Sequence, residues 1–186
     1  MIREMVAGAN AALTAENPGL AQVLVGIGWT VTSSRGPQAE LVPMAIMCGP
    51  NGKALTSAHV VFFNQLESPE GTVAFAADDA DDQEQIDVQL DRIPADVAKI
   101  VFFVYVDPDI RGSGTFGAVR AAHIRVATRE NRDLVKFSVP LENVRSVGAV
   151  MFGELYRHGS DWKFRALGQG YAGGLASVFA DFGIAP

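Results

Sequence analysis

Cysteine is almost absent from the chain, since Cys48 is the only one. A single cysteine cannot form a disulfide within the chain and cannot supply a cysteine-rich metal site. The simplest interpretation of Cys48 is a small buried apolar residue. A chain without internal disulfides fits a reducing compartment, so we expect a cytoplasmic protein.

The chain also lacks a surplus of positive charge and any long apolar run. Its formal net charge is −6 and its pI is near 5.0. These values argue against a nucleic-acid-binding protein, which needs a basic face. No run approaches the roughly 18 apolar residues that a membrane helix needs, and the N-terminal stretch has no apolar signal-peptide core. We therefore expect neither nucleic acid nor a membrane as a partner.

A third missing feature is the alternation of strands with long helices that marks a parallel α/β sheet. Instead, turns separate about ten short segments with apolar residues at every second position, which predicts an all-β sandwich of two mainly antiparallel sheets. With 186 residues, 48% of them hydrophobic, the chain suits a single domain over residues 1–186. The predicted strands are 20–29, 40–48, 54–65, 72–76, 84–90, 100–106, 118–128, 133–139, 149–159 and 162–168.

Three segments carry more specific predictions. The segment 100–106, IVFFVYV, is apolar on both faces, which predicts a central strand. Pro43 lacks a backbone donor and predicts an edge position or a bulge in 40–48. A short C-terminal helix is expected over 174–183, whose apolar stripe consists of Leu175, Val178, Phe179 and Phe182.

The glycines of GQGYAGG, residues 168–174, match the spacing of a dinucleotide-binding turn. That site also needs a second strand and an acidic residue about 20 residues further on, and the sequence contains neither. We therefore interpret the glycines as a close-packed connection between the last strand and the helix.

The three histidines, His59, His123 and His158, lie far apart in the sequence. None belongs to a spacing that indicates a nucleophile, a metal-ligand pair or two catalytic carboxylates. We expect His59 and His123 to be packed or exposed residues of strands, and the protein not to be an enzyme. A buried polar pocket that joined His59 or His123 to a carboxylate would favour an enzyme instead.

Negative charge is concentrated in AFAADDADDQEQIDVQL, residues 74–90. The stretch is either a solvated loop or a site for a hard cation, because calcium takes six to eight oxygen ligands and clustered carboxylates supply several of them. The loop lacks the alternating aspartates and the glycine of an EF-hand, which excludes that motif. The acidic residues of the stretch before and at the start of the predicted strand are Asp78, Asp79, Asp81, Asp82 and Glu84.

Several blocks together resemble the tellurium-resistance TerD family, over roughly residues 9–184. These blocks are NAALTAENPGLAQVLVGIGW, VVFFNQLESPEGTV, EQIDVQLDRIPADVAKIVFFV, FGAVRAAHIRV and, as the most specific, MFGELYRHGSDWKFRALGQGYAGGLASVFADFG. The resemblance implies a β-sandwich with calcium in acidic loops at one end, a bacterial cytoplasmic role in the response to tellurite and other toxic agents, and no established enzymatic activity.

The departures from the family pattern concern the implied calcium ligands. An Asp-Leu-Asp of the family reads Glu40-Leu41-Val42 here, Gln83 replaces an Asp, and the acidic loop is shorter and lacks its glycines. Each lost carboxylate removes a ligand and weakens affinity, so we expect one weak site or none. The candidate calcium ligands are Glu40, Asp78, Asp79, Asp81, Asp82 and Glu84.

Two functions follow from the resemblance. The first is a non-enzymatic, calcium-responsive domain of a stress system. The alternative is a scaffold of the same fold that works without calcium and binds other stress-response proteins through a sheet edge or an apolar patch.

Overall fold

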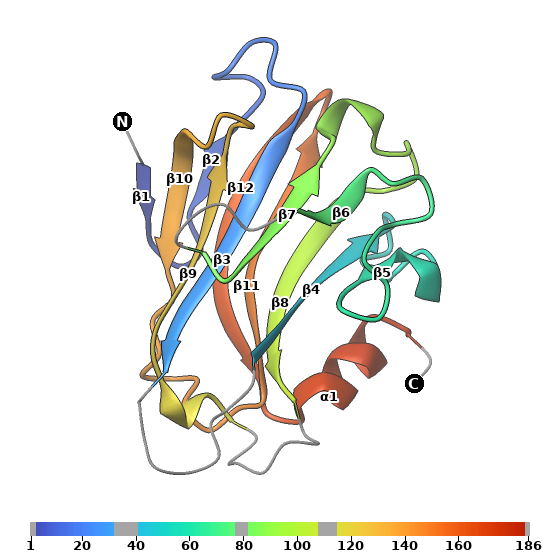
Figure 1. Ribbon diagram of the computed structural model, residues 1–186. Helices are drawn as coiled ribbons and strands as arrows, with labels where there is room; N and C mark the ends of the chain where they lie inside the picture. Colours follow the sequence, from blue (N-terminus) through green and yellow to red (C-terminus); the bar gives the residue numbers. More distant parts are fainter. Residues whose placement is uncertain (1–2, 32–40, 77–81, 108–114, 185–186) are drawn as a thin grey trace.

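Two six-stranded sheets lie face to face in the computed structural model, which describes residues 3–31, 41–76, 82–107 and 115–184 (Figure 1). Sheet A has the order β1 (Arg3–Met5), β10 (Asp133–Ser138), β9 (Val119–Ala127), β3 (Val23–Val31), β7 (Glu84–Val88) and β6 (Val73–Ala76). Sheet B has the order β2 (Asn10–Ala12), β12 (Asp161–Tyr171), β11 (Ala149–His158), β8 (Lys99–Val106), β4 (Leu41–Cys48) and β5 (Val60–Val61). β1 pairs with β10 in parallel, and the other pairs are antiparallel. The predicted all-β sandwich is therefore confirmed.

The alternation of apolar and polar residues determines which face of sheet A is buried. Val23, Val25 and Ile27 of β3 are fully buried and belong to the core between the sheets. Alternate side chains of a strand point to opposite faces, so Gly26 and Gly28 lie on the outer face of the same strand. This outer face carries the polar residues described below.

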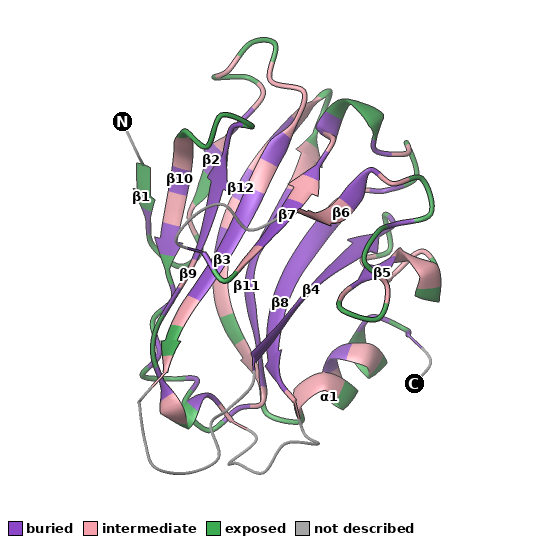
Figure 2. Cartoon of the chain, in the orientation of Figure 1, coloured by how far each residue is buried: buried purple, intermediate pink, exposed green. Residues whose placement is uncertain are grey.

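The predicted central strand of 100–106 is confirmed as β8, which lies between β4 and β11. Both faces of β8 are buried because α1 (Gly174–Asp181) covers the outer face of sheet B, forming a second apolar cluster with it (Figure 2). Phe182, just after α1, packs edge-on against Phe103, with 5.3 Å between the ring centroids. Cys48 lies in this cluster, and burial raises the pKa of its thiol to about 12, as expected of a packing residue.

Within the described residues, Pro43 lies on a part of β4 that is paired on one side only, because β5 pairs with Ala45 and Ile46. The predicted edge position is thus confirmed for this part of the strand.

The prediction of one strand over 54–65 was wrong. The segment forms the 3-10 turn η1 (Ser57–His59) and the two-residue β5, so His59 is not a strand residue. The Thr56 hydroxyl accepts a hydrogen bond from the backbone of Ala58, and the Gln65 side chain donates to the carbonyl of Val60. These side chains satisfy backbone groups locally, which competes with extension of the strand.

Candidate functional site

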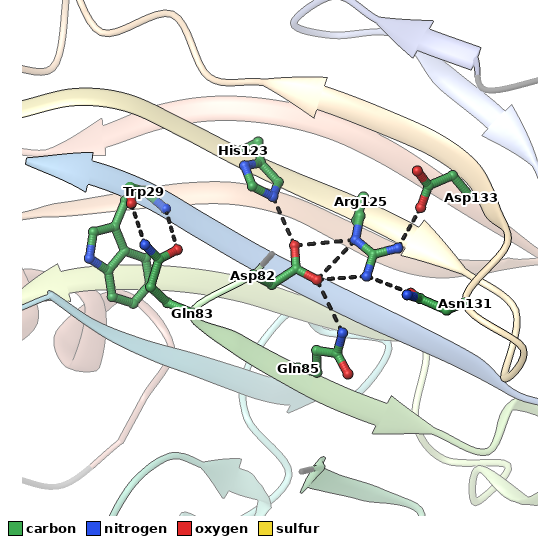
Figure 3. Close-up of polar contacts among 8 residues, drawn as sticks. All are labelled: Trp29, Asp82, Gln83, Gln85, His123, Arg125, Asn131 and Asp133. Atoms are coloured by element: carbon green, nitrogen blue, oxygen red, sulfur yellow. Dashed lines mark hydrogen bonds and ion pairs between the residues drawn. The ribbon is translucent and has the colours of Figure 1, made fainter. Parts of the chain in front are cut away.

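Asp82 lies within the acidic stretch, two residues before β7 begins, and is 4% exposed. Its carboxylate accepts hydrogen bonds from Arg125 Nη2 at 2.7 Å and from Gln85 Nε2 at 3.2 Å (Figure 3). His123 Nε2 lies 2.9 Å from Asp82 Oδ1. Both oxygens are therefore engaged by side chains of β7 and β9.

Arg125 is the centre of this polar network. Its guanidinium binds Asp82 through Nε and Nη2 and pairs with Asp133 through Nη1. Nη2 also donates to Asn131 Oδ1 at 2.7 Å, and Asn131 holds a left-handed conformation with φ 64° in the turn between β9 and β10. One buried cation thus ties the acidic stretch, two strands and a turn together.

Two glycines of β3 provide the space that this network occupies. A Cβ on Gly26 would lie 2.3 Å from Asp82 Oδ2, and a Cβ on Gly28 would lie 2.2 Å from His123 Cε1. Both distances are shorter than real carbon contacts, so the carboxylate and the imidazole lie against the backbone of β3 only because these positions have no side chain. The alternation of VGIGW therefore serves two purposes, a core on one face and a polar recess on the other.

The electrostatics favour an ionised Asp82. Burial by itself raises the pKa of this carboxyl, but the hydrogen bonds from His123, Arg125 and Gln85 outweigh burial and lower the pKa well below its ordinary range. Burial likewise acts to lower the pKa of Arg125, but its bonds to Asp82 and Asp133 raise that pKa on balance. The pair is charged, and each charge is already compensated.

Gln83, the residue after Asp82, is anchored to strand β3 by its side chain. Its side-chain oxygen accepts from the backbone N–H of Trp29 at 2.8 Å, and its amide donates to the carbonyl of Trp29. Asp82 and Gln83 together fix the point at which the chain enters β7.

Of the predicted calcium ligands, Glu40, Asp78, Asp79 and Asp81 lie outside the described residues. Asp82 and Glu84 are described, and they are not brought together. Glu84 pairs in register with Ile27, a core residue, whereas Gln85 pairs with Gly26 on the outer face. Since directly opposed residues share a face, Glu84 points to the inner side of sheet A and Asp82 lies on its outer side.

Glu84 lines a cavity of about 270 Å³ that opens beside β4, β6 and β7. Asp107, which follows β8 and which the sequence patterns did not single out, lines the same cavity. The other lining residues are apolar: Leu41, Val42, Pro43, Phe63, Leu66 and Phe75. The two carboxylates are suitable calcium ligands, although within the described ranges no group of three or more His, Cys, Asp or Glu side chains forms a metal site.

His123 does contact a carboxylate, as an enzyme hypothesis requires. The same carboxylate is also bound by Arg125, which neutralises its charge. His123 and Asp82 thus belong to the network centred on Arg125.

The whole chain matches a known family. Residues 1–182 match the model of the TerD domain. The chain belongs to the TerD family. Tellurium resistance protein TerD of Serratia marcescens is 39% identical to the chain in an alignment of 183 residues that covers 95% of each protein. General stress protein 16U of Bacillus subtilis (strain 168) is 34% identical, with 99% of this chain and 98% of that protein covered.

A solved TerD homologue has the same fold. The crystal structure of a homologue of telluride resistance protein (TerD) from Streptomyces coelicolor A3(2) superposes with a TM-score of 0.68, at 26% identity, over 90% of this chain and all of that one. The resemblance inferred from the sequence blocks is thus confirmed, and this TerD chain is related to tellurium-resistance and stress-response proteins. No helix of the described residues is long and apolar enough to span a membrane.

Proposed function

We propose that this TerD-family chain is a non-enzymatic, cytoplasmic stress-response domain that binds calcium weakly where the acidic stretch enters β7. The observation that carries this proposal is that Glu84 and Asp107 line one cavity at that point. Calcium would take carboxylate oxygens from these two residues. Glu40, Asp78, Asp79 and Asp81 stay candidate ligands on the evidence of the sequence, and they lie outside the described residues.

In this proposal Asp82 is not a ligand. Its charge is neutralised by Arg125, and its place on the outer face of sheet A separates it from Glu84. Asp82 instead anchors the chain to sheet A just before β7.

Thermal unfolding in chelator and again with calcium tests the metal site. A ligand that binds only the folded state stabilises it by about 2.7 kcal/mol at a hundredfold excess over Kd, which is a rise of several degrees for a domain of this size. We expect this rise with calcium and not with magnesium, and we expect Glu84→Gln to reduce it. Glu130→Gln, in an exposed turn, is the matched control and should keep the full rise.

The alternative is a calcium-independent scaffold for other stress-response proteins, and a specific apolar surface favours it. Phe63 is 56% exposed and Leu66 is 59% exposed, and both lie at the mouth of the same cavity. Large exposed apolar side chains grouped at a cavity are typical of a contact surface.

Phe63→Ser combined with Leu66→Ser tests this alternative. If the surface binds a partner, tagged wild-type protein will retain one from an extract in chelator, and the double variant will lose it. Val6→Ser, at another exposed apolar residue (73%), should retain the partner. Absence of any calcium effect, together with such a partner, would establish the scaffold in place of the calcium domain.

A further inference from the structure

A second, separate concavity lies on the outer face of sheet A, where β9 and β10 begin and end beside η3 (Phe116–Ala118) (Figure 1). Its volume is about 400 Å³. Its polar lining is mainly basic and consists of Arg120, His123, Lys136, Ser138, Glu142 and Arg145. Its base is apolar, formed by the buried Ala122, Val139 and Leu141.

The sheet register explains why these groups converge. Ser138 of β10 lies directly opposite His123 of β9, so their side chains share the outer face. Lys136 lies two residues from Ser138 and therefore points the same way. The chain after β10 then folds back towards η3, where the Phe116 N–H donates to Val147 and the Arg145 carbonyl approaches Gly117.

Two basic side chains of this concavity, Lys136 and Arg145, have no acidic partner within the described residues. Among the residues that the structure describes, neither Lys136 nor Arg145 forms an ion pair or a side-chain hydrogen bond. Glu142 is the one carboxylate of the lining. The nearby Asp82 is bound by Arg125 and by His123, and Asp133 is bound by Arg125. Positive charge thus collects here although the chain as a whole has a net charge of −6.

We propose that this concavity binds a phosphate group or a chemically similar oxyanion, either free or as part of a small molecule. Like charges held around one recess repel each other, and a bound anion relieves that repulsion. Arginine and lysine bind oxyanions through charge-assisted hydrogen bonds, and a serine hydroxyl donates a further one. Strands β9 and β10 position His123, Lys136 and Ser138, and Arg145 comes from the turn that follows β10.

The test is an NMR titration with inorganic phosphate, in chelator and at constant ionic strength. We expect saturable shifts of the backbone amides of 120–123 and 136–145, with a Kd that rises at least about tenfold in the double variant Lys136→Gln, Arg145→Gln. The double variant Lys163→Gln, Arg92→Gln changes the charge equally at sites remote from the concavity, and it should bind as the wild type does. Chelator keeps the test independent of the calcium site.

Glycerol 3-phosphate as a second probe separates the two sources of a phosphate group. Tighter binding of the monoester assigns the site to a phosphorylated metabolite, and tighter binding of phosphate assigns it to the free anion. Shifts that do not saturate, that appear elsewhere on the wild-type protein, or that weaken equally in both double variants would overturn the proposal. If the test variant failed to fold, the location of the wild-type shifts would decide alone.

Discussion

At the scale of single residues, Asp82 is a candidate calcium ligand by sequence but an ion-pair partner of Arg125 in the fold. As part of a run of aspartates it is an obvious calcium ligand. In the folded chain its oxygens are occupied by Arg125, His123 and Gln85, and it is almost fully buried. Burial of the charged carboxylate without these partners would cost several kcal/mol. The ion pair with Arg125 offsets this cost and so allows Asp82 to be buried.

The pH dependence of stability reports this role. The folded pKa of Asp82 lies below the unfolded value of about 3.9, so its contribution is complete above about pH 4 and is lost as the pH falls towards the folded pKa. We expect urea unfolding at pH 7 to show Asp82→Asn less stable by about 3–5 kcal/mol. On acidification the wild type should then lose more stability than the variant.

Asp91→Asn is the control for that experiment, because Asp91 is exposed in η2 (Leu90–Arg92). Its stability should follow the wild type at every pH. Parallel pH curves for wild type and Asp82→Asn would show that the buried pair does not determine acid sensitivity.

At the scale of elements, β3 is a strand with two different faces. Its valines and Ile27 form core, and its glycines leave room for polar side chains that arrive from β7 and β9. Glycine weakens a strand because it has no side chain to pack. Here that loss is offset by the bonds that Asp82 and His123 make above it.

Gly28→Ala tests whether the missing side chain of β3 matters. The new methyl group must displace the His123 imidazole, and we expect a loss of about 1–3 kcal/mol in the free energy of unfolding. In a His123→Ala background the same substitution should cost much less, because the clashing ring is gone. Gly117→Ala, whose nearest neighbour would be 3.4 Å away, should be nearly neutral. Equal costs in both backgrounds would contradict the steric explanation.

At the scale of the whole molecule, the two sheets share one core. Buried residues of both sheets belong to a single apolar cluster, including Val25 and Ile124 from sheet A and Phe102 and Phe152 from sheet B. Neither sheet can unfold without exposing the other, so the predicted single domain should unfold cooperatively.

The two tryptophans make this expectation measurable, because Trp29 lies in β3 and Trp162 in β12. In Trp29→Phe the fluorescence reports sheet B, and in Trp162→Phe it reports sheet A. Within each variant we expect the fluorescence transition and the circular dichroism transition to coincide in urea. Separate midpoints within one variant would indicate that the sheets are distinct folding units.

The sequence by itself determined the fold class, the central strand β8, the C-terminal helix and the family, because these depend on local periodicity and on residue patterns along the chain. It also singled out Asp82 and Glu84, as candidate calcium ligands. It failed at η1 and β5, where side chains such as Thr56 and Gln65 satisfy the backbone in place of a ladder.

Only the tertiary structure decided how the acidic and basic residues are distributed in space. Asp82 and Glu84 are two positions apart, yet the sheet separates them. Arg125 and Asp82 are 43 positions apart, yet they form an ion pair. Lys136, Arg145 and His123 meet in one concavity because strand register and chain reversal bring them together. Such contacts are set by register and by the choice of sheet face, which depend on packing across the whole core and leave no regular spacing in the sequence.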